Sequence, residues 1–339
     1  MLVFQVVYGR VIRVFMDGCL LVRRCGGWLL VAVIALVGLA GPVAGQDGYP
    51  GLDDAAWDRV ELAAGIVWQY AAFSGPGGVP QYINLLVIQA DTAARRIRFA
   101  AAGKAGGISG GEPDITLDNA TDDDTRFLRP SEFAARYPAL AVVNGGFFSD
   151  HPDEVNSGIF KWQGTVWPFT REEPEELRFV GSSAFGLDAG GNWIFMNREG
   201  NAWTGDWPEA VSALAGAHRL IDDGVIPEPV MSGRWHSARE IRHSGLRHPR
   251  TAACLTGNRQ LILLVADGRH REAVGFTLTE LAQLLHDFGC VDAVNLDGGG
   301  SSTMYIDGSG VVNHPSDNRA FDRDGERPVR TAIVIDGIE

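Results

Sequence analysis

The stretch NLDGGGSST, residues 295–303, places one carboxylate, Asp297, at the end of a strand-like run and follows it with a turn rich in glycine and hydroxyl groups. Glycines reach positive φ and let the backbone approach a ligand closely, and the serines and threonine offer hydroxyl and N–H groups to an anion. No lysine follows the glycines, so the turn lacks the Gly-Lys-Ser/Thr ending of a nucleotide-binding P-loop. An isolated DGGG is more typical of an ordinary turn, but the preceding residues favour a site.

Those preceding residues predict a strand, a helix and a second strand. The run LILLVA at 261–266 is apolar throughout, as in a strand buried on both faces. Thr277 and Glu280 have the spacing of a capping box, and apolar residues recur at helical intervals until Gly289. A second apolar run at 291–296 leads into the DGGG turn. We therefore predict a βαβ unit around 261–297, with a right-handed crossover between parallel strands.

Parallel strands end on the same edge of a sheet, so polar residues after both strands are expected to converge. Asp267 and Arg269 follow the first strand, and Asp297 follows the second. Ligands of α/β sheets bind outside the carboxyl ends of strands, which is where these three residues are predicted to lie. The alternative is that Asp267 and Arg269 pair with each other as surface charges.

Two further segments have a similar form. The short run at 140–143 leads into Asn144 and a pair of glycines, and Ser131 is expected to cap a short helix before it. Arg250 opens another strand-like run, 252–255. A guanidinium at a strand edge is often solvated, but its planar fork also suits bidentate phosphate binding.

Five motifs, in this order, resemble those of the phosphodiester glycosidase family. The resemblance extends from about residue 57 to residue 338, and the segments 171–178 and 232–248 look variable or inserted. The motifs are NGGFF at 144–148, PRT at 249–251, DGR at 267–269 followed by GFTLTELA, NLDGGGSST at 295–303, and RPVRTAIVI at 327–335.

This resemblance implies cleavage of the bond between C1 of a sugar and a phosphodiester oxygen, giving a free sugar and a phosphomonoester. Asp297 is then the carboxylate that faces C1, as nucleophile or as base on water, and Asp267 orients it or is the second carboxylate. A phosphate leaving group is a weak base that needs positive charge more than a general acid, and Arg250 and Arg269 are the candidates to supply it. Asn144 is expected to hold a sugar hydroxyl or a phosphate oxygen.

The remaining predicted binding residues lie in the glycine turn and near the C-terminus. They are Gly298, Gly299, Gly300, Ser301 and Ser302, as secondary donors, and Asp317 in the segment PSDN. Two other functions stay open: a phosphodiesterase that cuts the P–O bond, which would need a His and Asp metal cluster, and a non-catalytic module that binds surface polysaccharide. Substrate identity, including GlcNAc-1-phosphodiesters and polymeric glycan phosphodiesters, is not fixed by these residues.

Metal and cofactor signals are weak. The acidic segments 122–124 and 322–325 have the composition of calcium loops without the twelve-residue pattern, so no cofactor is expected and calcium is a minor alternative. His236, His243 and His248 lack zinc-site spacing and are predicted to be solvated residues of a basic loop.

The N-terminus predicts export. Four arginines precede an apolar run at 28–40, and small residues follow it, as in a secretory signal peptide covering residues 1–45, with Met16 as an alternative start and an uncleaved anchor as the alternative role. Residues 46–339 then form a single catalytic domain in a secreted or periplasmic protein. Removing the four arginines and Asp17 changes the formal charge from −13 to −16. Such acidity excludes nucleic acid and anionic membranes as general partners, so a phosphate-bearing glycan must be held by local arginines.

The predicted fold class is α+β, a mixed and largely β core with helices at its edges. Two cysteines of the catalytic domain, Cys254 and Cys290, lie in predicted core strands. An oxidising compartment permits a disulfide between them, and buried free thiols are an equal alternative.

Overall fold

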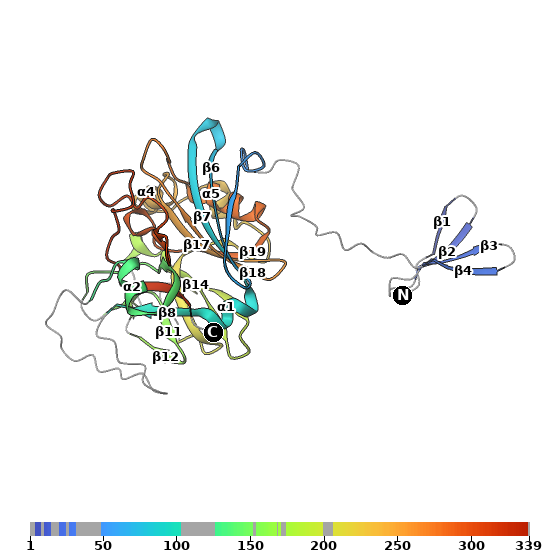
Figure 1. The fold of residues 1–339 in the computed structure, drawn as a ribbon, viewed down its shortest axis with the longest axis horizontal. Helices are drawn as coiled ribbons and strands as arrows, with labels where there is room; N and C mark the ends of the chain where they lie inside the picture. The colour runs from blue at the N-terminus through green and yellow to red at the C-terminus, as the bar shows by residue number, and fades with distance from the viewer. Residues whose placement is uncertain are drawn as a thin grey trace. The chain divides into compact units, whose positions relative to one another are not determined.

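The computed structural model describes residues 4–7, 10–14, 20–24, 27–31, 49–102, 126–151, 154–167, 169–170, 174–198 and 206–337. The chain divides into two compact units, residues 1–43 and 44–339 (Figure 1). The first contains an antiparallel sheet of β1 (Phe4–Val7), β2 (Arg10–Val14), β3 (Leu20–Arg24) and β4 (Gly27–Val31), paired in chain order. Within the described segments, no helix has the length and apolar character needed to cross a membrane. The signal peptide stays a prediction, and most of its apolar run lies outside the described residues.

An eleven-stranded sheet dominates the second unit. Its strands are β5 (Asp58–Ala63), β6 (Ile66–Ser74), β7 (Pro80–Gln89), β11 (Phe160–Trp162), β12 (Thr165–Val166), β14 (Val180–Asp188), β15 (Trp193–Asn197), β16 (Ala210–Ile221), β17 (Arg250–Thr256), β18 (Gln260–Ala266) and β19 (Cys290–Asn295). Nine of them follow the order β12-β11-β16-β19-β17-β18-β7-β6-β5, while β14 pairs with β16 and β15 pairs with β14.

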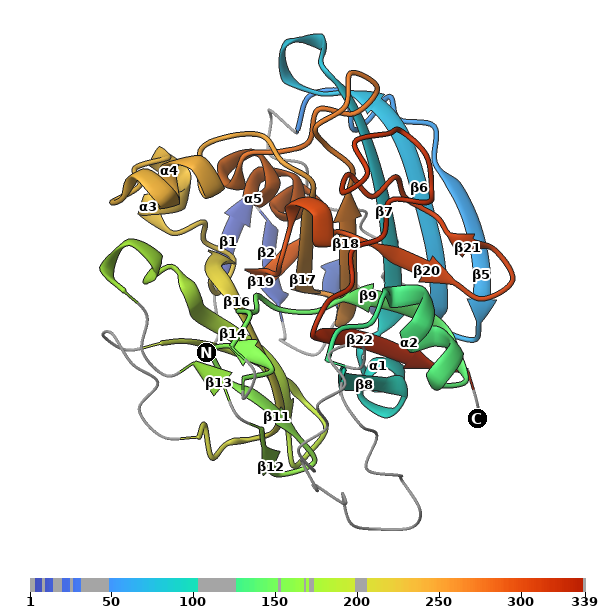
Figure 2. The ribbon, with the colours of Figure 1, turned by 90° about the vertical axis from the view of Figure 1, so that its left-hand side faces the viewer.

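A five-stranded antiparallel sheet packs against it. Its strands are β8 (Ile97–Ala101), β9 (Ala139–Asn144), β20 (Met304–Ile306), β21 (Gly310–Val311) and β22 (Thr331–Asp336), in the order β21-β20-β9-β22-β8. A small parallel pair joins β10 (Asn156–Ser157) and β13 (Phe169–Thr170). The helices are α1 (Ala90–Arg96), α2 (Pro130–Arg136), α3 (Glu228–Ser232), α4 (Ala238–Ser244) and α5 (Leu278–Asp287), with 3₁₀ turns η1 (Pro76–Gly78), η3 (Glu175–Leu177) and η4 (Gly299–Ser301). Figure 2 shows these elements from a second side.

The period-two alternation of strand side chains explains the layers. In β18, Leu261, Leu263 and Val265 enter the core shared with the smaller sheet, whereas the alternate residues Ile262 and Leu264 pack against α5. A strand covered on both faces must be apolar throughout, as predicted for this run. On the outer face of the smaller sheet, α2 adds the remaining layer. The α+β class with a largely β core is confirmed.

The βαβ prediction is confirmed in its elements and refined in its pairing. The helix α5 begins after Thr277, whose hydroxyl accepts from the Glu280 amide at 3.1 Å, while a Glu280 carboxylate oxygen accepts from the Thr277 amide at 2.9 Å. The strands β18 and β19 run the same way, but β17 lies between them and is antiparallel to both. The start of β17 therefore lies beside the ends of both neighbours: Arg250 is opposite Ala266, and Ala252 is opposite Asn295.

The expected helix cap at Ser131 is wrong. The helix α2 begins at Pro130, so Ser131 lies in its first turn. Its hydroxyl instead donates to the Glu326 carboxylate at 2.6 Å. Proline is well suited to the first helical position because the N–H it lacks has no intrahelical partner there.

A disulfide joins β17 to β19. Cys254 and Cys290 are bonded, with their Cα atoms 5.8 Å apart, and both residues are buried in the layer beneath α5. The bond crosslinks the strand that begins with Arg250 to the strand that leads to Asp297. The alternative of two free thiols does not apply to the folded structure.

We expect the double variant Cys254→Ala/Cys290→Ala to lose about 2–4 kcal/mol of unfolding free energy, because a crosslink between residues 36 positions apart restricts the unfolded chain. Urea denaturation followed by circular dichroism measures this loss. Dithiothreitol should lower the midpoint of the wild type and leave that of the double variant unchanged. Equal midpoints for the oxidised wild type and the variant would contradict the prediction.

Candidate active site

A cavity of about 410 Å³ opens where the ends of β18 and β19 flank the start of β17. Among the described residues that line it are five arginines, two histidines and a single carboxylate, Asp297. The lining consists of Arg239, Arg242, His243, His248, Arg250, Arg269, Asp297, Gly298, Gly299, Gly300 and Arg327. Three of the five predicted motifs, PRT, DGR and NLDGGGSST, thus contribute to one cavity. The first arginine of the fifth motif, RPVRTAIVI, lines it as well.

Asp297 is held at the cavity by its backbone. Its amide donates to the Gly145 carbonyl at 3.2 Å, and its carbonyl accepts from Asn144 Nδ2 at 2.7 Å. Its side chain opens to the cavity and is otherwise enclosed by protein, and this burial raises the pKa of Asp297 to about 6. The Ser301 hydroxyl and the Arg327 guanidinium act in the opposite direction and limit the rise. A carboxyl group with this pKa changes its charge within the working range of most enzymes.

The glycine turn is shaped by the arginines that lie against it. Gly299 has a φ of +63°, and a Cβ there would lie 2.8 Å from Arg269 Nη2. A Cβ at Gly300 would lie 2.5 Å from both Arg327 Nη2 and Asp317 Oδ1. Any larger side chain would displace a guanidinium, so the glycines bring two cations directly against the backbone beside Asp297.

Arg250 is the most buried cation of the cavity. Its side chain is 1% exposed, and it donates to three backbone carbonyls: Phe276 at 2.8 Å, His243 at 2.6 Å and Leu246 at 3.0 Å. Burial, and secondarily the charge of Arg269, lower the pKa of Arg250 to about 9, so the guanidinium stays charged at neutral pH. Within the described part of the chain it has no carboxylate in ion-pair contact, so a bound anion would supply the missing counter-charge.

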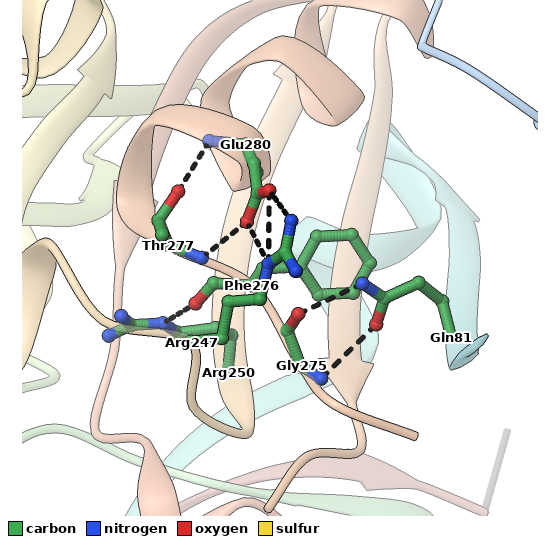
Figure 3. A network of polar contacts seen from close by, with 7 residues as sticks. All are labelled: Gln81, Arg247, Arg250, Gly275, Phe276, Thr277 and Glu280. Atoms are coloured by element: carbon green, nitrogen blue, oxygen red, sulfur yellow. Dashed lines mark hydrogen bonds and ion pairs between the residues drawn. The ribbon is translucent and has the colours of Figure 1, made fainter. Parts of the chain in front are cut away.

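The segment that carries the Phe276 carbonyl is itself fixed on both sides (Figure 3). Gln81 of β7 donates to the Gly275 carbonyl at 2.9 Å and accepts from the Gly275 amide at 3.2 Å. On the other side, Glu280 of the capping box accepts from Arg247 Nε at 3.1 Å. The Phe276 carbonyl, which accepts from Arg250 Nε, is therefore held in a fixed position.

Arg269 is placed by a histidine. Its Nε donates to His248 Nδ1 at 3.3 Å, and His248 Nε2 lies 2.8 Å from the Arg242 carbonyl. Because the guanidinium can only donate and the carbonyl can only accept, His248 is the neutral tautomer with its proton on Nε2. Burial lowers the pKa of His248, which favours this neutral form. Arg269 also has a φ of +66°, a conformation that non-glycine residues adopt at a cost.

Asp317 lies at the edge of the cavity as the partner of Arg327, whose Nε donates to Asp317 Oδ1 at 3.0 Å. This ion pair turns one face of the Arg327 guanidinium toward the glycine turn. Arg327 was not among the predicted binding residues, although it opens the RPVRTAIVI motif.

Two predicted site residues lie behind the cavity instead of lining it. Asp267 is fully buried and accepts from Asn313 Nδ2 at 3.1 Å, from the His314 amide at 2.9 Å and from His314 Nδ1 at 2.6 Å. Asn144 is equally buried: its Oδ1 accepts from the Thr251 hydroxyl at 2.8 Å. Both amide and carboxylate groups are thus engaged by the protein.

The two serine hydroxyls of the glycine turn have different surroundings, one beside Asp297 and the other in the buried network of Asn144. Ser301 lies beside the Asp297 carboxylate and lowers its pKa. Ser302 is buried, and its hydroxyl lies 3.2 Å from the Thr251 hydroxyl that donates to Asn144. Ser301 therefore acts on the cavity through Asp297, whereas Ser302 belongs to the buried network.

One wall of the cavity comes from the Arg/His-rich segment 232–248, which resembles an insertion in the sequence. Solvation of its histidines is wrong for two of the three. His243 stacks on Phe179, with ring centroids 5.0 Å apart, and burial holds the pKa of His243 well below its usual value. His248 is half-buried against Arg269, whereas His236 is exposed as predicted. The sequence signal that could have indicated this wall is the high density of arginine and histidine over residues 234–248.

The described residues contain no group of three His, Cys, Asp or Glu side chains placed to hold a metal ion. Residues 122–124, one of the two acidic segments, lie outside the described residues. In the other, Asp322 Oδ1 accepts from Asn318 Nδ2 at 2.8 Å and from the Asp324 amide at 3.0 Å.

We expect Gly299→Ala to weaken the binding of inorganic phosphate about tenfold, because the methyl group displaces the Arg269 guanidinium and removes one charge-assisted contact. Gly308→Ala is the matched control, since Gly308 has a φ of +73° and open space around its Cβ. Both changes should cost about 1–2 kcal/mol of unfolding free energy through backbone strain. Isothermal titration calorimetry and urea denaturation check the two quantities. Equal phosphate affinity in the two variants would contradict the placement of Arg269.

Comparison with known proteins agrees with the motifs and the fold. The family model for phosphodiester glycosidases matches residues 137–336. N-acetylglucosamine-1-phosphodiester alpha-N-acetylglucosaminidase of Mus musculus is 44% identical over 69 residues, which are 20% of this chain and 13% of the mouse protein. The catalytic domain of the zebrafish protein of that name has a similar fold, with a TM-score of 0.58 and 18% identity over 84% of this chain and 88% of that domain. A Burkholderia pseudomallei protein named as exported gives a TM-score of 0.55 at 14% identity, covering 87% of this chain and 99% of that one. The chain belongs to the phosphodiester glycosidase family.

Proposed function

We propose that this protein hydrolyses the C1–O bond of a sugar-1-phosphodiester and releases a free sugar and a phosphomonoester. The observation that carries the proposal is the composition of the cavity, in which one carboxylate, Asp297, faces five arginines. We further propose N-acetylglucosamine as the sugar, because the mouse and zebrafish relatives are named for that substrate. A secreted or periplasmic location accords with the predicted leader.

The leaving group explains why one carboxylate is sufficient. Glycosidases that expel an alkoxide use two carboxyl groups, one of which protonates the departing oxygen. A phosphomonoester departs as a weak base, so positive charge that stabilises the developing anion takes the place of the general acid. The C1–O bond breaks, its electron pair leaves with the phosphate oxygen, and the oxygen of water ends on C1. Asp297 delivers this attack, either through its own oxygen or by taking a proton from the water.

The roles of the other residues follow from their contacts. Arg250, Arg269 and Arg327 bind the phosphate, with the Gly298 to Gly300 backbone close by. Asp267 and Asn144 are positioning residues: Asn144 holds the Asp297 carbonyl, and Asp267 holds Asn313, whose Nδ2 also donates to the Ser302 carbonyl at 3.0 Å. Both therefore act on the glycine turn through the protein rather than on the substrate.

We expect the wild type to place oxygen-18 from labelled water on the C1 hydroxyl of N-acetylglucosamine when it hydrolyses a GlcNAc-α-1-phosphodiester. Asp297→Asn should lower turnover by about 10²–10⁴-fold, the usual contribution of a proton-transfer or nucleophilic carboxylate. Asp307→Asn, which changes an exposed aspartate in the β20–β21 turn, is the control and should keep full activity. Mass spectrometry of the two products locates the label.

Label on the phosphate would show P–O cleavage by a phosphodiesterase and would overturn the roles given to Asp297 and the arginines. Binding of a panel of sugar phosphodiesters without turnover would favour the non-catalytic module instead.

The pH dependence of kcat/KM should follow the ionisation of Asp297. Because the pKa of this carboxyl is raised to about 6 and only its charged form attacks, kcat/KM should be constant above pH 7 and fall about tenfold per pH unit below pH 6. The phosphodiester stays ionised over this range, so the profile reports the free enzyme. Initial rates from pH 4 to pH 8 at low substrate concentration test this. A profile that is flat down to pH 4.5, or that rises below pH 6, would contradict the role.

A further inference from the structure

The cavity carries more positive charge than one phosphodiester can neutralise. A phosphodiester bears one negative charge, whereas five arginines line the cavity with one carboxylate, Asp297, and Asp317 outside the lining pairs with Arg327. Of these arginines, Arg269 and Arg327 lie against the glycine turn, and the charge of Arg250 lies near that of Arg269. The other two, Arg239 and Arg242, lie on α4 and are called the outer pair here. Since the chain as a whole has a formal charge of −13, this local excess of cations stands out.

The outer pair belongs to the wall of the cavity whose backbone bonds to Arg250 directly and to Arg269 through His248. The α4 helix is capped by Ser237, which accepts from the Glu240 amide at 3.0 Å. The carbonyls of His243 and Leu246 accept from Arg250, and the Arg242 carbonyl accepts from His248. Because His248 also bonds to Arg269, the backbone of α4 is fixed relative to both Arg250 and Arg269. The backbone that carries the outer pair therefore has a defined position beside Arg250 and Arg269.

Little in the protein offsets the charges of the outer pair. Arg239 is 55% exposed, and its ion pair with Glu176 is long, at 3.9 Å between Nε and Oε1. Exposed pairs of this kind contribute little to stability. For Arg242, which is exposed at the cavity, the described residues show no ion pair. Five like charges around one small cavity repel one another unless anions bind between them.

We propose that Arg239 and Arg242 form a second anion subsite, for a negative group of the substrate one unit beyond the scissile phosphodiester. This inference rests on the proposed function and narrows its substrate class to polyanionic glycans, such as chains with repeated phosphodiesters. Arg250 lies next to α4, whereas Asp297 lies by Arg269 and Arg327. With the outer pair on the Arg250 side of the site, the negative group that it binds belongs to the aglycone beyond the phosphate.

Two synthetic substrates and three forms of the full chain test this. Both substrates are diesters of GlcNAc-α-1-phosphate; one has 2-hydroxyethyl phosphate as its aglycone, and the other has the neutral 2-methoxyethyl group of similar length. We expect wild type to have a kcat/KM about tenfold higher for the doubly phosphorylated ester, the size expected from two exposed guanidinium–phosphate contacts. In Arg239→Gln/Arg242→Gln this ratio should fall to about one. Arg234→Gln, which changes an arginine of the same stretch that is 80% exposed and outside the cavity, should keep the wild-type ratio.

Raising the salt concentration gives a second readout, because exposed charges are screened over about 8 Å at physiological ionic strength and less at higher salt. The wild-type ratio should therefore decrease between 0.15 and 0.5 M sodium chloride, while the ratio of the double variant should not change. A wild-type ratio near one, or equal losses on both esters in the double variant, would overturn the second subsite.

If wild type hydrolyses neither ester, the proposed function fails and the subsite is still testable by binding. Isothermal titration with pyrophosphate and with inorganic phosphate should then show tighter binding of pyrophosphate to wild type and to Arg234→Gln. Loss of this difference in Arg239→Gln/Arg242→Gln would support the subsite, and its persistence would overturn it.

Discussion

The structure around the cavity depends on one buried charge, the guanidinium of Arg250. A cation removed from water must be solvated by the protein, and here the solvation comes from carbonyls at the end of α4 and in the loop before α5. The Phe276 carbonyl is fixed in turn, because Gln81 of β7 bonds to Gly275 on one side and Thr277 belongs to the capping box of α5 on the other. These constraints join elements that are far apart in the sequence, and they leave part of the charge available to an anion.

The sequence was sufficient to predict the elements and the edge of the sheet, because both depend on local patterns. Continuous apolar runs and a capping box identified β18, α5 and β19 within one or two residues. The sequence was not sufficient to predict that β17 lies between the two parallel strands, because strand pairing is decided by long-range packing. That insertion is what brings Arg250 between the two strand ends, so the prediction that Arg269 and Asp297 converge holds through an arrangement that the βαβ pattern did not contain.

The sequence also could not predict whether a polar side chain after a strand points into the cavity or away from it. Asp267 and Asp297 both follow parallel strands, yet the Asp267 carboxylate accepts from His314 behind the cavity whereas Asp297 opens into it. The difference arises from the loop before β22, which approaches Asp267 from a distant part of the chain. The wall made by α4 was missed for the same reason: its contacts with Arg250 and His248 are set by packing, and only its unusual density of arginine and histidine is local.

The disulfide between β17 and β19 has a consequence for where the protein matures. Thiols stay reduced in most cytosols, whereas the periplasm and the extracellular space support disulfides. The strands that hold the central cation and the central carboxylate are crosslinked only after Cys254 and Cys290 are oxidised. Recombinant production in an ordinary bacterial cytoplasm would therefore yield a chain without this bond, and oxidative folding or export to the periplasm is the appropriate route to the native protein.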